Sequence, residues 1–368
     1  MSAAHTPGGR RAEGILFFGA YDPEYPRNAV IRKGLRRCGH SVSECQVDAR
    51  LKVFLRYPAL LWRYARLRSP GGIVFVPDFR HKDVPLAWAL ARCTGRKVVF
   101  DPLVSRYETR VLDRADVAPG SAQSWHNRNL DAMSLRLADL VLADTHAHAR
   151  FYAQEFGVAP RKIRVLPVGF DEDTFREAPF HAGRTHATVL FYGTYLPLHG
   201  VDTIVAAAGL LRGRPVRLML VGEGQTYDAA KGMAASLPED LLAFHPAVSL
   251  RDVARLLAEA DIVLGVFGRT PKAAMVVPNK VFQALAVGRP VITADTPAIR
   301  ELFTPGEHLL VVPPGDARAL AASIELLASD APMRKRLSEA GGSFVRARFN
   351  SQRIGEEMWR ILEEEGLR

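Results

Sequence analysis

The sequence predicts an α/β protein made of two Rossmann-like domains that face each other across a cleft. Short apolar runs rich in Val, Ile, Leu and Phe recur along the chain, and a turn and a longer segment of helical periodicity follow each run. This alternation is typical of parallel strands covered by helices. The runs form two sets of five, and a chain of 368 residues is long enough for two domains with separate cores.

The strand candidates divide between the two halves of the chain. The N-terminal set comprises Ile15–Gly19, Gly72–Val76, Lys97–Phe100, Leu140–Ala143 and Ile163–Leu166. The C-terminal set comprises Val189–Tyr192, Leu218–Val221, Ile262–Val266, Pro290–Thr293 and Leu309–Val312. Residues 167–188 lie between the sets and lack strong periodicity, which is typical of a linker. We expect an N-terminal domain over residues 1–170, a hinge over 171–187, a C-terminal domain over 188–347, and a helix over 348–368 that packs back on the N-terminal domain.

Composition and charge limit the class of protein. Hydrophobic residues make up 48% of the chain and charged residues 24%, which is the balance of a folded globular protein. The apolar run at residues 15–20 is too short for a signal or membrane segment, so we expect a cytoplasmic protein. Cys38, Cys45 and Cys93 lack the spacing of a zinc site or a disulfide framework. The net charge of +10 favours anionic partners, either nucleotide phosphates, nucleic acid or an anionic membrane.

Several segments occur in an order that resembles glycosyltransferase family 4 (group 1), whose members have the GT-B fold. In the N-terminal half they are ADLVLADT at residues 138–145 and VLPVGFD at residues 165–171. In the C-terminal half they are FYGT at 191–194, HG at 199–200, LVGEG at 220–224, ADIVL at 260–264 and PNKVFQALAVGRPVI at 278–292. The likeness covers most of the chain, and the hinge segment at 165–171 is its most specific part.

The resemblance implies an enzyme that moves a sugar from a nucleotide-diphosphate sugar to a hydroxyl acceptor, with retention of anomeric configuration. Such a reaction would serve polysaccharide, glycolipid or glycoconjugate synthesis. The nucleotide sugar would be a co-substrate, and no further cofactor or metal is expected. The acceptor would be a sugar, a lipid-linked group or a small molecule, and nucleic acid is not expected as a partner because the basic residues are dispersed and no reader motif occurs.

The start of the helix after Pro278 is the clearest candidate for binding the donor. Free backbone N–H groups and the positive dipole end of a helix attract a diphosphate, and Lys280 adds a cation. Gln283 lies one turn beyond Asn279, so its amide is suited to ribose hydroxyls. The alternative to a donor-binding helix is an ordinary capped amphipathic helix that binds no ligand. The donor-binding candidates are Gly193, Thr194, His199, Gly222, Glu223, Arg269, Lys272, Asn279, Lys280 and Gln283.

The sequence departs from the family pattern at this site. Members usually carry two glutamates that flank seven residues, and the corresponding positions here are Met275 and Gln283. Thr194 and His199 stand where an Arg and a Lys are usual. Arg269 and Lys272, in the loop before Pro278, are the candidates to supply the missing positive charge. These departures leave open a nucleotide-sugar epimerase of the same architecture, or a homologue that binds nucleotide sugars without catalysis.

The N-terminal half is expected to bind the acceptor. Asp101 and Glu108 follow a strand candidate and are the candidates for positioning an acceptor hydroxyl, since a general base must reach that proton at hydrogen-bond distance. The acidic triplet Asp171-Glu172-Asp173 lies in the hinge, and we interpret it as an exposed part of the linker. The candidates for the acceptor and phosphate side are Tyr21, Arg27, Asn28, Ser105 and Asp144.

Residues 51–68 form a basic and aromatic helix candidate. Lys52, Arg56, Arg63 and Arg66 fall on one side of a helical projection, with Trp62 nearby. Such a helix suits an anionic membrane surface, which would make the protein peripheral on the inner membrane face. A helix that merely covers the domain is the competing interpretation.

One further alternative concerns Asp144-Thr145-His146-Ala147-His148. Two histidines at a strand end resemble the first metal-ligand pair of amidohydrolases. An amidohydrolase would need further metal ligands at the ends of the following strands. The downstream strand candidates run into glycine or end in threonine and do not supply such ligands.

Overall fold

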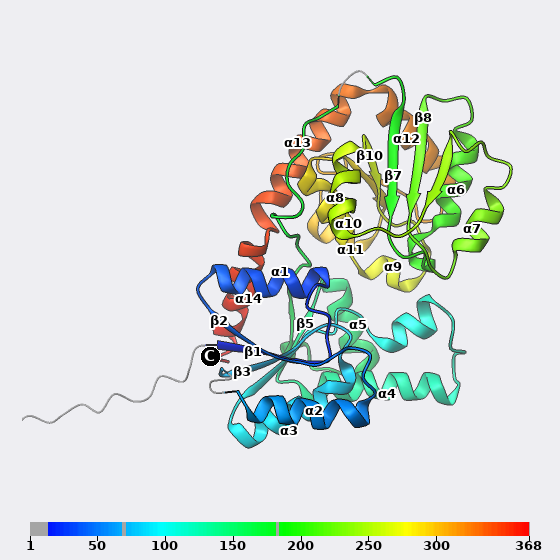
Figure 1. The fold of residues 1–368 in the computed structure, drawn as a ribbon. Coiled ribbons are helices and arrows are strands. Elements are labelled where there is room, and N and C mark those ends of the chain that lie inside the picture. The colour runs from blue at the N-terminus through cyan, green and yellow to red at the C-terminus, as the bar shows by residue number, and fades with distance from the viewer. Residues whose placement is uncertain (1–13, 68–70, 182–183, 368) are drawn as a thin grey trace, which may run out of the picture.

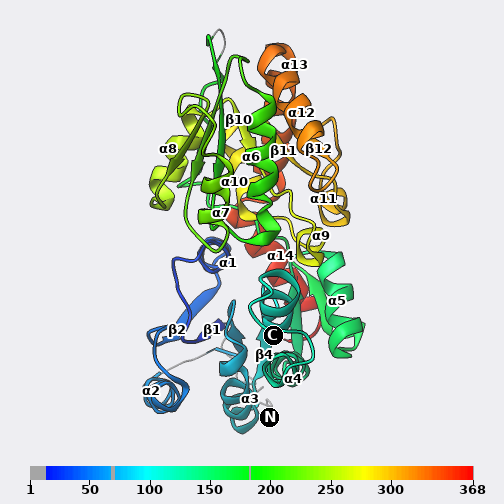
Figure 2. The same cartoon turned by 90° about the vertical axis from the view of Figure 1, so that its right-hand side faces the viewer.

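The computed structural model describes residues 14–67, 71–181 and 184–367, which form two domains (Figure 1). Each domain contains one parallel sheet of six strands, and helices cover its faces (Figure 2). Within these ranges, every helix is too short or too polar to span a membrane. The predicted α/β architecture with two Rossmann-like domains is confirmed.

The N-terminal sheet has the strand order β2-β1-β3-β4-β5-β6. β1, β3 and β5 are buried along their whole length, as expected for parallel strands covered on both faces. The strands are β1 (Gly14–Gly19), β2 (Ser41–Gln46), β3 (Ile73–Val76), β4 (Lys97–Phe100), β5 (Leu140–Ala143) and β6 (Ile163–Val165). The α-helices are α1 (Pro26–Arg37), α2 (Val53–Ala65), α3 (Val84–Thr94), α4 (Ala122–Leu137) and α5 (His146–Phe156). Shorter helical segments are η1 (His81–Asp83), η2 (Glu108–Asp113) and η3 (Pro160–Lys162).

The C-terminal sheet has the strand order β12-β11-β10-β7-β8-β9. Its strands are β7 (Ala187–Tyr192), β8 (Val216–Val221), β9 (Leu242–His245), β10 (Ile262–Leu264), β11 (Val291–Ala294) and β12 (Leu310–Val312). Its helices are η4 (Pro197–His199), α6 (Val201–Leu210), α7 (Tyr227–Met233), α8 (Leu250–Glu259), α9 (Pro271–Met275), α10 (Asn279–Val287), α11 (Pro297–Leu302), α12 (Ala317–Ser329) and α13 (Ala331–Arg348). The last helix, α14 (Ser351–Glu364), returns to the N-terminal domain.

Two strands were missed by the sequence analysis, which predicted five in each sheet. β2 and β9 lie at the edges of the two sheets. Only Cys45 of β2 and Leu242 of β9 are fully buried. Because an edge strand is covered less than a central one, neither segment needs the continuous apolar run by which the other strands were found.

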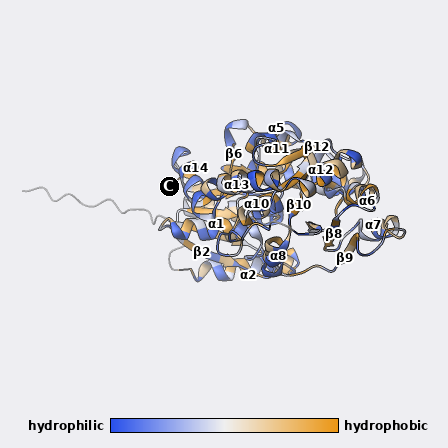
Figure 3. Cartoon of the chain, turned by 90° about the horizontal axis from the view of Figure 1, so that it is seen from above, coloured by the Kyte–Doolittle hydropathy of each residue, from blue (hydrophilic) through white to orange (hydrophobic). Residues whose placement is uncertain are grey.

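The outer helices are amphipathic because one side of each packs against a sheet or another helix. Seen from above, hydrophobic and hydrophilic residues alternate along helices such as α8 and α14 (Figure 3). In α14 the buried positions recur at helical spacing and include Ile354, Met358 and Ile361.

The two domains are joined by two crossings of the chain that touch each other. The hinge runs from β6 to β7, and the second crossing is the turn between α13 and α14. The Phe170 N–H in the hinge donates to the Phe349 carbonyl in the turn at 3.0 Å. The acidic triplet of the hinge is engaged by cations of α1: Lys33 pairs with Asp171, and Arg37 pairs with Glu172.

α14 packs directly against α1 through two glycines. A Cβ added to Gly355 would lie 2.2 Å from the carbonyl carbon of Gly34, and a Cβ added to Gly34 would lie 2.0 Å from the Ser351 carbonyl oxygen. Separations this short are impossible for real atoms, so only glycine allows the two backbones to approach at this crossing.

We expect Gly355→Ala to destabilise the protein, because the added methyl group forces α14 away from α1. Overpacking of this kind costs about 1–3 kcal/mol. Gly232→Ala in α7 is the matched control, since nothing lies within 4 Å of its Cβ and alanine favours helix. Thermal unfolding should show a lower midpoint for Gly355→Ala and an unchanged or higher midpoint for Gly232→Ala. Equal midpoints for Gly355→Ala and the unchanged protein would contradict the helix crossing described here.

Candidate active site in the interdomain cleft

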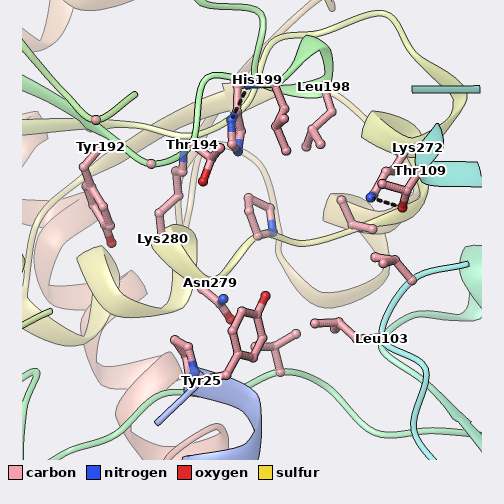
Figure 4. A pocket seen from close by; sticks show the side chains of 18 of the residues that line it. Tyr25, Leu103, Thr109, Tyr192, Thr194, Leu198, His199, Lys272, Asn279 and Lys280 are labelled. Carbon is pink, nitrogen blue, oxygen red and sulfur yellow. Dashed lines mark hydrogen bonds between the residues drawn. The ribbon is translucent and has the colours of Figure 1, made fainter. Parts of the chain in front are cut away.

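A cavity of about 950 Å³ lies between the domains. It is lined by loops that follow strands of both sheets and by the beginning of α10. This is where open parallel sheets bind ligands, beyond the carboxyl ends of their strands. Figure 4 shows Lys280, Thr194 and His199 on the side of the C-terminal domain, with Tyr25 and Leu103 opposite them.

Lys280 is the most unusual side chain of the cavity. It is 5% exposed, and its Nζ has no hydrogen-bond partner among the described residues. Its Nζ lies 3.9 Å from the centre of the Phe191 ring, and burial lowers its pKa well below the usual value, which disfavours the charged form unless an anion lies beside it. A buried cation without a partner is costly. Its position at the first turn of α10 therefore fits an anion that occupies the cavity.

The loop after β7 leaves room for that anion. Gly193 has a φ of 140°, and a Cβ there would lie 3.2 Å from Lys280 Nζ. His199 is buried, and burial together with Lys280 lowers its pKa well below the usual value, so the ring is neutral. Its Nδ1 lies 3.5 Å from the Leu196 nitrogen. Thr194 also lines the cavity.

The other donor-side candidates are divided between the cavity and its surroundings. Gln283 accepts from the Tyr192 hydroxyl at 2.7 Å, so only its NH2 group remains to donate. Lys272 lines the cavity and donates to Thr109 of the opposite domain at 2.8 Å (Figure 4). Arg269 does not line it, because its guanidinium is bound to the carbonyl of Gly315. The candidates that line the cavity are Gly193, Thr194, His199, Gly222, Glu223, Lys272, Asn279, Lys280 and Gln283.

Met275, which stands where the family pattern has a glutamate, connects the domains through its backbone. Its carbonyl accepts from the hydroxyl of Thr145 at 2.5 Å, and Thr145 caps the beginning of α5. The carboxylate of Glu301 in α11 binds the His146 N–H at 2.6 Å. The two domains are thus in hydrogen-bonded contact beside the cavity.

Five of the N-terminal candidates lie outside the cavity lining, namely Tyr21, Arg27, Asn28, Asp101 and Glu108. Arg27 is fully buried, and its Nε lies 2.6 Å from Asp101 Oδ2. Burial raises the pKa of Asp101, and the Arg27 charge opposes that rise. Tyr21 donates to Glu44 at 2.9 Å, and Asn28 donates to the Asp22 carbonyl at 2.8 Å. Ser105 and Asp144, by contrast, line the cavity.

Glu108 is buried in an ion-pair network with His148 and Asp144. His148 Nε2 lies 3.0 Å from Glu108 Oε2, and Nδ1 lies 2.7 Å from Asp144 Oδ1. Burial opposes the charged imidazolium, but the two carboxylates outweigh it and raise the pKa of His148 to about 10. Burial likewise opposes the charge of Glu108, but His148 lowers its pKa below the usual value. The network therefore carries a positive charge between two negative charges.

The arrangement of the histidines excludes the metal pair considered from the sequence. His148 lies between two carboxylates inside the domain, whereas His146 is exposed on the other side of α5. Across residues 14–67, 71–181 and 184–367, no group of three His, Cys, Asp or Glu side chains is placed to hold a metal ion.

Several lining residues were not predicted. Phe79 and Leu103 have φ values of 62° and 58°, a strained backbone that holds both side chains at the cavity. Arg106, Arg110 and Arg114 line the same wall. Their recurrence at every fourth position after a strand was a signal in the sequence that these cations share one face.

The basic helix α2 lies far from the cavity, at the other end of the N-terminal domain (Figure 2). Trp62, Arg63 and Arg66 are exposed there, and the Arg66 guanidinium lies 3.3 Å from the centre of the Trp62 ring. Arg56 differs from the other cations because it is buried and pairs with Asp83 at 2.9 Å.

Comparisons with known proteins agree with the fold. Residues 186–330 match the family model described as glycosyl transferases group 1. A phosphatidyl-myo-inositol mannosyltransferase of Mycobacterium leprae is 27% identical over 295 residues, which are 78% of this chain and 73% of that protein. Other curated relatives are matched over smaller shares, down to 39% of their length.

Solved structures share the fold over both domains. A sucrose-phosphate synthase from Thermosynechococcus elongatus superposes with a TM-score of 0.74 at 18% identity, over 96% of this chain and 98% of the other. Anabaena HepE in complex with UDP and glucose superposes with a TM-score of 0.70 at 16% identity, over 96% of this chain and 100% of the other. The predicted resemblance to group 1 glycosyltransferases and the GT-B fold are thereby confirmed, and the epimerase and non-catalytic alternatives are not favoured.

We expect the His148 network to stabilise the fold in a pH-dependent manner. The folded-state pKa of about 10 exceeds the usual value of 6.5, so the contribution of His148 is complete below about pH 6.5 and is lost as pH rises through 10. His148→Gln should therefore be more destabilising at pH 6 than at pH 10, by at least about 1.4 kcal/mol, the equivalent of one pKa unit. Urea unfolding at both pH values would measure the difference.

The control for this experiment is His126→Gln, which alters an exposed histidine of α4. Its effect should be small at both pH values. A loss of stability in His148→Gln that is the same at pH 6 and pH 10 would mean that His148 is not charged in the folded protein.

Proposed function

We propose that this glycosyltransferase of the group 1 type transfers a glycosyl residue from a nucleotide-diphosphate sugar to a hydroxyl acceptor, with retention of configuration and without a metal ion. The observation that carries the proposal is the buried amino group of Lys280 at the first turn of α10, which has no partner among the described residues. A diphosphate there would meet Lys280, whose charged form it would stabilise, together with the free N–H groups of the helix start and the imidazole of His199.

Stabilising the departing diphosphate would be the main electrostatic task of the site. Donors and charges that are fixed in place before the reaction act most strongly on charge that develops during it. The ribose would receive hydrogen bonds from the NH2 group of Gln283, whose orientation Tyr192 fixes. The base would lie against the apolar lining contributed by Val248, Leu250 and Val253.

The acceptor would approach from the N-terminal wall. Asp101 and Glu108 both lie outside the cavity lining and are held by Arg27 and His148, so neither is free to take a proton from an acceptor hydroxyl. Asp144 also pairs with His148, through Oδ1, but it lines the cavity, and its other carboxylate oxygen would accept a hydrogen bond from that hydroxyl. The proton would then pass to an oxygen of the leaving diphosphate, on the same face of the sugar as the attack.

We also propose that the N-terminal domain binds an anionic membrane surface. Phe54 and Trp62 are 69% and 60% exposed on α2. Residues 49–77 contain no Asp or Glu, and neither do residues 84–94 of the neighbouring α3. The exposed cations of this face are Lys52, Arg63, Arg66, Lys82 and Arg92. Such a face combines apolar anchors with charges that attract acidic lipids. A lipid-linked acceptor would follow.

The donor proposal is tested by thermal-shift titration with UDP, GDP, ADP and dTDP. We expect saturable stabilisation by one of the four nucleotides, because a ligand that binds only the folded state raises the unfolding midpoint. Lys280→Met should weaken that response at least tenfold while leaving the ligand-free midpoint unchanged or higher, since a buried polar group without a partner is removed. Lys335→Met, an exposed lysine of α13, should respond like the unchanged protein. Full nucleotide affinity in Lys280→Met would contradict the assignment of Lys280 to the donor.

The membrane proposal predicts weaker binding of Arg63→Gln/Arg66→Gln to vesicles that contain phosphatidylserine. Each cation near an anionic surface contributes about 1 kcal/mol, so affinity should fall roughly thirtyfold. Arg217→Gln/Arg318→Gln removes two exposed arginines of the C-terminal domain and should leave flotation unchanged. Equal flotation of all three proteins would remove the proposal.

A further inference from the structure

One histidine in the wall of the cavity has no hydrogen-bond partner. His81 begins η1, which follows β3, and it lines the cavity although it is only 1% exposed. Both of its ring nitrogens are buried, and neither has a hydrogen bond to any residue that the structure describes. Buried polar groups are almost always hydrogen-bonded, because leaving one unpaired is costly. The imidazole therefore has unused capacity for a ligand that enters the cavity.

The segment that carries His81 is held in place before any ligand binds. Asp83, two residues further along η1, accepts from the Ala20 N–H at 2.8 Å and from the Arg56 guanidinium at 2.9 Å. These two contacts tie η1 to the end of β1 and to α2. The imidazole itself packs edge-on against Phe100, with ring centres 5.0 Å apart. The position of the ring is thus fixed by the fold of the N-terminal domain.

A carboxyl group lies next to the ring. Asp131 of α4 is fully buried, and its Oδ1 lies 3.4 Å from His81 Nε2. Its Oδ2 accepts from the Tyr107 N–H at 2.8 Å, which fixes the carboxyl group. Burial raises the pKa of Asp131 to about 7, and burial together with the Arg106 charge lowers the pKa of His81 to about 3. The imidazole is therefore neutral near pH 7 and offers one N–H donor and one acceptor nitrogen.

The chemistry of this pair favours a hydroxyl group as the ligand. A neutral imidazole brings no positive charge to an anion. The residues that the structure describes include no group of three His, Cys, Asp or Glu side chains that could hold a metal ion. A hydroxyl both donates and accepts, so it can satisfy either ring nitrogen. Phe79, two residues before His81, also lines the cavity and is 37% exposed, which offers an apolar face to the C–H groups of a sugar ring.

We propose that His81 binds a hydroxyl group of a substrate sugar, and that Asp131 is a positioning residue that holds the imidazole. This inference rests on the proposed glycosyl transfer. The sugar is either the glycosyl group of the donor or the acceptor, and both present the same hydroxyl chemistry to the ring. The contact would orient that sugar relative to the diphosphate at the start of α10, and orientation of the reacting groups accelerates transfer.

The first test separates the sugar from its nucleotide by calorimetry. The ligands are UDP, GDP, ADP and dTDP, together with UDP-glucose, GDP-mannose, ADP-glucose and dTDP-glucose. If the hydroxyl belongs to the donor, His81→Leu should bind the nucleotide sugar about tenfold more weakly and the nucleotide alone with unchanged affinity, because only the sugar loses a hydrogen bond. His126→Leu, which alters an exposed histidine of α4, should match the unchanged protein in both affinities.

The thermal midpoint of His81→Leu shows whether the variant is folded. It should be unchanged or higher without ligand, because a buried polar group that lacks a partner is removed. If the hydroxyl belongs to the acceptor, the loss should appear instead in the binding of methyl α-glucoside or methyl α-mannoside. Saturation-transfer NMR would measure that binding with and without saturating nucleotide.

The second test observes the ring nitrogens of His81 directly by ¹H–¹⁵N NMR. A nucleotide sugar or glycoside that bonds to the ring should shift at least one ring nitrogen, whereas a purely structural histidine would give the same spectrum with and without the ligand. Asp131→Asn should reduce the sugar-dependent affinity and leave nucleotide affinity unchanged.

The proposal is overturned if nucleotide sugars and glycosides bind independently of His81 and leave its ring nitrogens unshifted. It is also overturned if His81→Leu weakens the binding of nucleotide and nucleotide sugar equally. A failure to bind any of the four nucleotides would contradict the donor proposal alone, because the glycosides and the ring nitrogens are also measured without nucleotide.

Discussion

The cleft depends on the direct contact of two helix backbones. α14 follows the last helix of the C-terminal domain and crosses α1 at Gly34 and Gly355, where no side chain separates the chains. The contact is reinforced by the acidic hinge, whose carboxylates bind cations of α1 and the Ser351 hydroxyl. Through this junction the loops after the strands of one sheet come to face those of the other.

Charged side chains behind the cavity wall are paired, whereas several of those at its surface are not. The charges behind its wall are matched: Arg27 with Asp101, and His148 with Glu108 and Asp144. The cations at its surface, Lys280 on one wall and Arg106 and Arg114 on the other, have no such partners among the described residues. Matched charges keep the wall rigid, while the unmatched ones are left for a ligand.

The sequence was sufficient for most of the fold and part of the site. Apolar runs located the central strands, and the segment at 278–292 located α10 with Lys280, Asn279 and Gln283 at the cavity. It could not show that Arg27 and Asp101 neutralise each other, because the two lie far apart in the chain and meet only through the sheet. The lack of a partner for Lys280 is likewise a property of the folded surroundings. The edge strands β2 and β9 escaped because their burial is slight.

The paired crossings of the chain limit how the domains can move. A single linker would let one domain tumble around the other, but the hinge and the α13–α14 turn meet side by side where Phe170 is bonded to Phe349. Because both attachments lie along one line, rotation of one domain about that line is the easiest relative motion. Opening and closing would then retrace one arc, so that each closure returns the same pairs of residues to register across the gap, including Lys272 with Thr109 and Thr145 with Met275.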